Sequence, residues 1–131
     1  MPSSNQVWIR STSFKVEEGE DAETNKGIYG KAFAQWLARK LQENGEQVID
    51  IVAEDWGRCI LLKENPHTFI GCANRWGETT EWGVFVEVKE GLLKGIFGGG
   101  NSGNEVQRLE ELLEKILKAA EEVDQFIVEP N

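Results

Sequence analysis

The sequence has very few of the residues on which metal sites and disulfide frameworks depend. Two cysteines and one histidine occur among its 131 residues, too few cysteines for the disulfide scaffold of a small secreted protein. A zinc site normally needs four donors, and only Glu54 and the distant His67 could join Cys59 and Cys72. We therefore expect both cysteines to be reduced and to bind no metal.

Recognisable catalytic motifs are also missing. His67 has no serine or cysteine at a motif spacing that would complete a triad. Glu54 and Asp55 are neighbours on an expected strand, so they point to opposite faces and make a poor carboxylate pair. The segment "GIYGK" resembles part of a phosphate loop, but Ala32 stands where that motif needs serine or threonine. We expect no catalytic residue and no cofactor.

Positive charge is scarce, and long apolar runs are absent. The chain has 23 acidic and 14 basic residues, a net charge of -9. A nucleic-acid-binding protein normally needs a basic surface to neutralise phosphates, so we expect no nucleic-acid partner. No apolar run reaches the roughly eighteen residues of a membrane span, and the first residues lack the pattern of a secretory signal. The sequence predicts a soluble cytoplasmic protein without membrane contact, whose charge favours a basic partner.

Two segments have the apolar periodicity of amphipathic helices, residues 26–45 and 104–123. Short links between successive strand-like segments predict an antiparallel meander. The order β-α-β-β-β-β-α-β indicates one α+β domain over residues 1–131, with a mainly antiparallel sheet and both helices on one face. Segments rich in β-branched and aromatic residues, typical of strands, span residues 7–14, 47–55, 58–64, 67–75, 80–89 and 124–130.

Side-chain alternation predicts which residues face the helices. We place the hairpin centres at Trp56-Gly57, Asn65-Pro66 and Gly77-Glu78. If Pro66 instead takes the second turn position, the pairing slides by two residues and the faces persist. One face then collects a nearly apolar set that we assign to the core: Ile49, Ile51, Ala53, Ile60, Leu62, Phe69, Gly71, Ala73, Trp82, Val84, Val86 and Val88.

The opposite face carries an apolar row that the helices do not need. An apolar row of this kind is either a binding surface or is covered by the terminal strands or by residues 91–97. Cys59 and Cys72 share this face in either register. The apolar row is Val52, Leu61, Ile70 and Phe85, beside a row of Glu54, Cys59, Cys72 and Gly83 and a charged row of Asp50, Lys63, Thr68 and Glu87.

Three of the five tryptophans stand directly before glycine. Trp56 and Trp76 fall at turns, where glycine supplies a positive φ. Trp82 falls inside a strand and points into the core, while Gly83 opens a gap on the opposite face. We expect Trp56 and Trp76 to be partly exposed aromatic contacts.

Three segments carry a resemblance: "GIYGKAFAQWLARKL", "AEDWGRCI" and "FIGCANRWG". The stretch from about residue 27 to 90 resembles small single-domain bacterial proteins with a Gly-Lys helix start, an Asp-Trp-Gly turn and a Gly-Cys strand. These motifs are structural, so the resemblance implies a fold and no active site. The acidic, tryptophan-rich composition is also similar to immunity proteins of bacterial toxin systems and to phage-encoded inhibitors.

The sequence favours a non-enzymatic protein-protein interaction domain of immunity or inhibitor type, which binds a basic partner or a second copy. Glycines at 98–103 predict a mobile connection, and residues 91–97 a helical turn. The alternative is a small-molecule-binding protein or enzyme with its site under residues 91–103, which would act as a lid. The expected contact surface is Val52, Leu61, Ile70 and Phe85, with Glu54, Trp56 and Trp76.

Overall fold

The fold was taken from a computed structural model, which describes residues 6–64, 66–89 and 102–128. The elements confirm the α+β class and the predicted order, with one additional 3-10 turn. They are β1 (Val7–Arg10), η1 (Glu20–Ala22), α1 (Lys31–Glu43), β2 (Asp50–Glu54), β3 (Gly57–Glu64), β4 (His67–Asn74), β5 (Glu81–Lys89), α3 (Ser102–Ala119) and β6 (Gln125–Val128).

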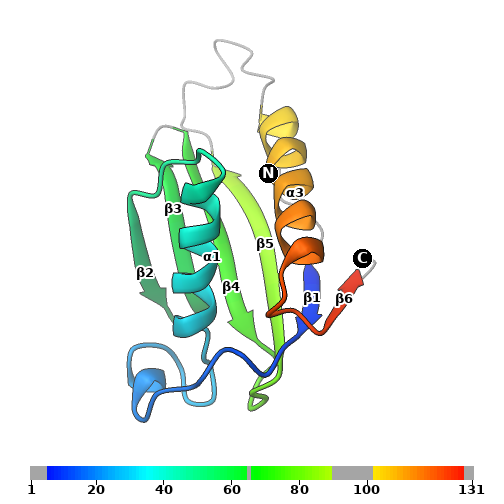
Figure 1. The fold of residues 1–131 in the computed structure, drawn as a ribbon. Coiled ribbons are helices and arrows are strands. Elements are labelled where there is room, and N and C mark those ends of the chain that lie inside the picture. Colours follow the sequence, from blue (N-terminus) through cyan, green and yellow to red (C-terminus); the bar gives the residue numbers. More distant parts are fainter. Residues whose placement is uncertain (1–5, 65, 90–101, 129–131) are drawn as a thin grey trace.

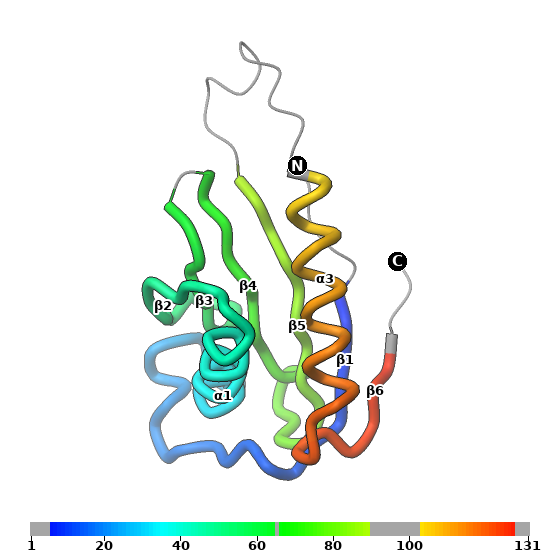
Figure 2. Tube along the Cα trace, turned by 45° about the horizontal axis from the view of Figure 1, so that its top comes forward, coloured from blue at the N-terminus to red at the C-terminus, as the bar shows by residue number. Residues whose placement is uncertain are grey.

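The strands form one antiparallel sheet in the order β2-β3-β4-β5-β1-β6. Strands β2 to β5 are the predicted meander, and β1 inserts between β5 and β6. Both helices lie on the same side of the sheet, with α1 against β3 and α3 against β5 (Figure 1, Figure 2). Among the residues that the structure describes, the sheet therefore has one face covered by both helices and one face without a helix, which we call the helix-free face.

Helix α1 begins five residues later than predicted. Gly27 and Gly30 have φ angles of +83° and +134°, which lie outside the helical region and interrupt the segment. The carboxylate of Glu20 caps the start of α1. Its Oε2 accepts hydrogen bonds from the backbone N–H groups of Gly30 at 3.3 Å and Lys31 at 3.2 Å. These N–H groups have no partner inside the helix, so the carboxylate stabilises the helix start.

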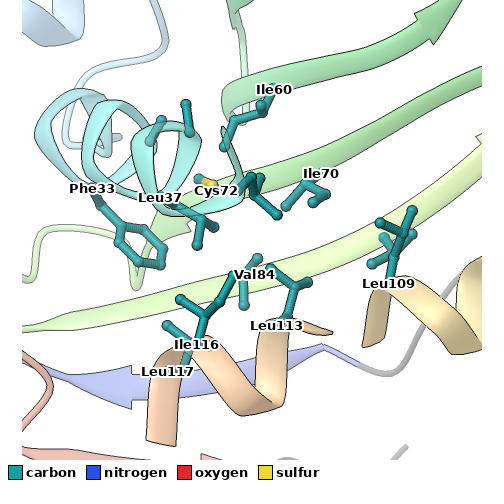
Figure 3. Close-up of a cluster of buried hydrophobic side chains, with 14 of the residues drawn as sticks. Phe33, Leu37, Ile60, Ile70, Cys72, Val84, Leu109, Leu113, Ile116 and Leu117 are labelled. Carbon is teal, nitrogen blue, oxygen red and sulfur yellow. The ribbon is translucent and has the colours of Figure 1, made fainter. Parts of the chain in front are cut away.

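The core lies between the sheet and the two helices (Figure 3). Aliphatic side chains of β3, β4 and β5 meet the apolar stripes of α1 and α3. Burying such side chains stabilises the fold by about 25 cal/mol per Å² of apolar surface. The labelled members of the cluster are Phe33, Leu37, Ile60, Ile70, Cys72, Val84, Leu109, Leu113, Ile116 and Leu117.

Strand β4 faces the opposite way to the prediction, and a β-bulge is the first reason. Near the turn Glu64 pairs with His67, as expected from a centre at Asn65-Pro66. The register then shifts, so that Leu61 pairs with Phe69 instead of Ile70. A bulge adds one residue to a strand, and a shift of one residue exchanges the two faces.

The second reason is the loop between β4 and β5. The backbone N–H of Arg75 donates to the carbonyl of Glu81 at 3.2 Å, which leaves an odd number of residues between them. The two-residue turn that we expected at Gly77-Glu78 needs an even number. Only β4 is therefore reversed: Thr68, Ile70, Cys72 and Asn74 face the helices, and Phe69, Gly71 and Ala73 face away.

The predicted faces of β2, of β5 and of β3 as far as Leu62 hold. Lys63, which we placed on the helix-free face, instead donates from its Nζ to Glu105 of α3 at 3.2 Å, and Ile49, which we assigned to the core, is 41% exposed. The β2–β3 turn is centred on Asp55-Trp56 instead of Trp56-Gly57, a slide of two residues that preserves both faces. Leu62 and Val86 are buried in the core as predicted, and Ile51 is half-buried beside it. Residues 91–101, for which we predicted a helical turn and a glycine connection, lie outside the described residues. Ser102 and Gly103 belong to α3, which begins two residues earlier than expected.

Within the ranges described above, neither helix has the length and apolarity needed to cross a membrane.

Candidate functional site

The helix-free face carries a cluster of three aromatic side chains from three elements. Trp56 from the β2–β3 turn lies with its ring centroid 5.3 Å from that of Phe85 on β5 and 6.3 Å from that of Phe69 on β4. The rings of Phe69 and Phe85 are 6.1 Å apart and nearly perpendicular. These distances are typical of favourable aromatic pairs. We call Trp56, Phe69 and Phe85 the aromatic cluster.

Two glycines allow rings to lie directly on the sheet. A Cβ atom at Gly71 would overlap the ring of Phe85 and lie 2.9 Å from Cη2 of Trp56. A Cβ atom at Gly83 would lie 2.8 Å from both Cζ3 of Trp8 and Nε2 of Gln6. Gly83 therefore does open a gap on this face, as predicted, and Trp8 fills it. Glycine in a strand is unfavourable on its own, and close ring packing is one reason to retain it.

A groove runs between the aromatic cluster and Trp8. Its volume is about 410 Å³, within the usual range for ligand sites of about 300–1,000 Å³. Ala73, which pairs with Gly83 and stands two residues after Gly71, lies between the two ring-covered glycines. Small residues at these positions leave room above the strands. The groove is lined by Gln6, Trp8, Trp56, Phe69, Ala73, Asn74, Phe85, Glu87 and Lys89.

Two rings on this face are covered by cations that also contact a carboxylate. The guanidinium carbon of Arg75 lies 4.1 Å from the ring centroid of Trp8, and its Nε donates to Oε1 of Glu81 at 2.6 Å. Nζ of Lys89 lies 5.6 Å from the ring centroid of Phe69 and 3.5 Å from Oε2 of Glu87. A cation above a ring is attracted by the negative face of the π system.

Carboxylates without such a cation stand beside the aromatic cluster. Over the described part of the chain, Glu54 and Asp55 form no ion pair, and they are the two residues that precede Trp56 in the sequence. The charge of Glu54 affects the pKa of the Cys59 thiol on the same face. Burial raises its pKa to about 12, and the negative charges of Glu54 and Glu87 add to the rise, while Lys89 opposes it. Negative charge therefore borders the aromatic cluster on the side of β2, while the groove itself is lined by one carboxylate, Glu87, and one ammonium, Lys89.

Most of the predicted contact surface lies on the helix-free face. Val52 is 37% exposed there, Leu61 and Phe85 are half-buried, and Trp56 is 38% exposed. The prediction for Ile70 is wrong. Ile70 pairs with Ile60 and Val86 and is fully buried beneath the helices. Phe69 takes its place on the helix-free face, as a consequence of the reversed β4. Glu54 lies on the same side, at the end of β2.

Trp76 is exposed, as predicted, but lies away from the groove. Its side chain is 74% exposed, and its Nε1 donates to the carbonyl of Lys26 at 3.0 Å. The ring covers Gly27, whose added Cβ atom would lie 3.0 Å from Nε1. Trp76 therefore holds the loop that precedes α1.

The two cysteines lie on opposite faces, which corrects the expectation that they share one. Cys59 pairs with Gly71 on the helix-free face, whereas Cys72 pairs with Arg58 and points into the core. Their side chains therefore diverge across the sheet, and both thiols are free. Burial also raises the pKa of the Cys72 thiol. Within the described ranges, no three potential ligands from His, Cys, Asp and Glu are grouped to hold a metal ion.

Sequence reasoning missed Trp8 and Gln6 as groove residues. The sequence does place Val7 and Ile9 on one face of the first strand, so alternation assigns Trp8 to the other. It does not indicate that β1 pairs with β5, where Trp8 stands opposite Gly83. That pairing joins residues far apart in the chain, and no local pattern encodes it.

The "GIYGK" segment is occupied by the protein's own carboxylate. Glu20 accepts from the N–H groups of Gly30 and Lys31, which are the groups a phosphate would use. The buried side chain of Arg58 holds the same loop, donating to Oε1 of Glu23 at 2.9 Å and to the carbonyl of Glu20 at 3.2 Å. This region therefore has a structural role: it holds the loop that precedes α1 against the start of the helix.

The groove offers groups suited to recognition: aromatic rings, a primary amide, a carboxylate and an ammonium. The one thiol on the same face, Cys59, is protonated at neutral pH because its pKa is raised to about 12 by burial, and the thiolate is the reactive form. The chain matches no family model, no curated protein and no solved structure.

Proposed function

We propose that the chain is a non-enzymatic protein-protein interaction domain that binds a basic partner protein on its helix-free face. The observation that carries this proposal is the groove of about 410 Å³ between Trp8 and Trp56. Aromatic residues in such positions are frequent anchors of protein interfaces. The net charge of -9 would steer a basic partner toward the chain.

The contact surface of the proposal extends beyond the groove. Val52, at 37% exposed, and the half-buried Leu61 continue the apolar area from the aromatic cluster toward β2. A partner protein that covers both areas gains more apolar burial than a small molecule in the groove alone. A second copy of the chain is disfavoured because two surfaces of the same negative charge repel each other.

An acidic binding domain of this kind is in keeping with an immunity or inhibitor protein, whose targets can be basic. A cytoplasmic location belongs to the same proposal, since unpaired cysteines suit a reducing compartment. The alternative site, under residues 91–103, falls largely outside the described residues, and no observation on the described part favours it.

Affinity capture from an extract of the native cell tests the proposal, with three forms of the chain as bait. The wild type and Trp76→Ala should retain the same basic protein, because Trp76 lies away from the groove. Trp56→Ala should lose it, since one of the four aromatic residues that line the groove is removed. The interaction is then repeated with the purified partner, and its affinity should fall as salt is raised.

Circular dichroism must show that the three baits are folded before they are compared. Retention of the partner by Trp56→Ala at wild-type level would contradict the proposed surface. Loss of the partner from Trp76→Ala and Trp56→Ala alike would also contradict it, because the contact would then not be specific to the groove.

A further inference from the structure

We infer that the groove between Trp8 and Trp56 is a receptor for an arginine side chain of the partner, whose guanidinium would stack on Trp56 and pair with Glu87. This inference rests on the proposed function and names the chemistry by which the partner is held. Three observations support it: a pattern repeated within the face, a ring and a carboxylate that are available, and the shape of the groove.

The repeated pattern is a cation above a ring, held by a carboxylate. Arg75 stacks on Trp8 with its guanidinium carbon 4.1 Å from the ring centroid, while Glu81 accepts its Nε–H at 2.6 Å. Lys89 lies above Phe69, with Glu87 at 3.5 Å. The chemistry proposed for the partner is therefore already used twice by the chain's own residues on the same face.

Trp56 provides the ring that is still available. It is 38% exposed, and no Lys or Arg of the described residues lies over it. Its contacts are the two phenylalanines of the aromatic cluster, which leave one side toward the groove. A partner's cation can therefore reach the ring without displacing an internal one.

Glu87 provides the carboxylate. It lines the groove with Trp56, and its contact with Lys89 is a loose one at 3.5 Å. The Lys89 side chain is half exposed, so water already solvates its charge and the pair contributes little on its own. An arriving guanidinium can replace Lys89 at Glu87, and Glu54 nearby adds negative charge on the side of β2.

The groove favours arginine over other groups. Ala73 lies between Gly71 and Gly83, which are covered by aromatic rings. This arrangement suits a planar group such as a guanidinium more than a compact group such as an ammonium. A guanidinium is planar, stacks on aromatic faces and presents several donors to one carboxylate, whereas an ammonium is a strongly hydrated point charge. An acidic peptide, a nucleic acid or a second copy of the chain would bring negative charge to an already negative border.

The test uses a synthetic peptide of alternating glycine and arginine, blocked at both ends, as the probe. Its matched control replaces arginine by citrulline, which keeps the planar shape and removes the charge. Binding is followed by tryptophan fluorescence and by the indole N–H signals in NMR spectra of the intact chain. We expect the citrulline peptide to bind at least about tenfold more weakly, and a lysine peptide to fall between the two.

Variants of the chain sharpen the test. Glu87→Gln should lower the affinity for the arginine peptide about fivefold, because the charged hydrogen-bond acceptor becomes neutral. Trp56→Ala should abolish binding, and Trp76→Ala should leave it unchanged. Lys89→Met should strengthen binding, because the competing cation is removed while the apolar stem remains over Phe69. A gain of affinity cannot be produced by a variant that merely unfolds.

Equal binding of the arginine and citrulline peptides, or unchanged affinity in Glu87→Gln, would overturn the inference. If cell extracts yield a partner whose capture depends on Trp56, yet the arginine peptide does not bind, the proposed function stands and this inference fails. If the peptide binds as expected and no Trp56-dependent partner is captured, the cation site stands and the proposed function fails.

Discussion

The two faces of the sheet are built from the same strands and use opposite packing strategies. On the helix-bearing face, branched aliphatic residues such as Ile60, Ile70 and Val86 are completely buried against α1 and α3. On the helix-free face, aromatic rings lie against Gly71 and Gly83, and cations lie over the rings of Trp8 and Phe69. Aliphatic interlocking leaves no room for a partner, whereas rings that lie on glycine keep an accessible side.

Within a single strand, residues on one face stabilise the fold and residues on the other face are available for binding. Along β4 the side chains that face the helices, such as Ile70 and Cys72, alternate with those that face the other way, Phe69, Gly71 and Ala73. A side chain on the first face should therefore matter mainly for unfolding, and one on the second mainly for binding. Each of the following substitutions bears on one face of this comparison.

The largest effect is expected at Ile70. Ile70→Ala leaves a cavity beneath the helices and should lower the free energy of unfolding by about 2–5 kcal/mol, as for other buried aliphatic residues. Leu61→Ala, the control on the helix-free face, should lose less than half as much. Urea denaturation of both variants measures the difference. A loss at Ile70 no larger than that at Leu61 would place Ile70 on the helix-free face.

Gly71 tests the packing of rings on the helix-free face. In Gly71→Ala the new methyl group collides with the rings of Phe85 and Trp56, which should lower the free energy of unfolding by about 1–3 kcal/mol. The control is Gly103→Ala in α3, where no atom lies within 4 Å, so it should stabilise the helix by up to about 1 kcal/mol. Thermal melts that move both variants in the same direction would contradict the described packing.

The smallest effect on stability is expected at a group of charged residues on the helix-bearing side of the sheet. Arg108 and Lys63 hydrogen-bond to Glu105 and lower its pKa to about 2. Because this lies below the ordinary value of 4.5, the stabilisation is complete above about pH 5 and is lost as pH falls through about 2. Glu105 is in contact with solvent, so Glu105→Gln should lower stability at pH 7 by about 1 kcal/mol at most.

Denaturation from pH 7 down to pH 2 measures this contribution. The wild type and Glu105→Gln should differ most at pH 7 and converge near pH 2, and added salt should narrow the gap. A gap that stays constant over this pH range would show that the variant acts through packing and not through charge.

The order of the elements was predictable because it depends on local patterns. Apolar periodicity defined the helices, and short links defined the meander from β2 to β5. The facing of β4 was not predictable, because a bulge beside Leu62 and a loop with an odd number of residues before Glu81 each change the alternation by one residue. Neither leaves a signature in composition, and both depend on how the finished strands twist and pack.

The candidate site was predictable to a similar extent. Val52, Leu61 and Phe85 were assigned to the helix-free face from alternation, and they lie there; Trp56 was predicted to be a partly exposed aromatic contact at a turn, and it lines the groove on the same face. The assignment of Ile70 failed together with that of β4. Trp8 was missed because its place depends on the pairing of β1 with β5, the last strand of the meander, which is a property of the tertiary structure.

The insertion of β1 between β5 and β6 has a consequence for protein synthesis. Val7 pairs with Val84 on one side and with Val128 on the other, so β1, which is synthesised before β5 and β6, must wait for partners made much later. Contacts of such high sequence separation form slowly. Trp8 arrives with that strand, so one wall of the groove is assembled only after β5 has emerged. A nascent or truncated chain that lacks β5 has neither Phe85 and Glu87 nor the strand that pairs with β1, so it presents no complete groove to a partner.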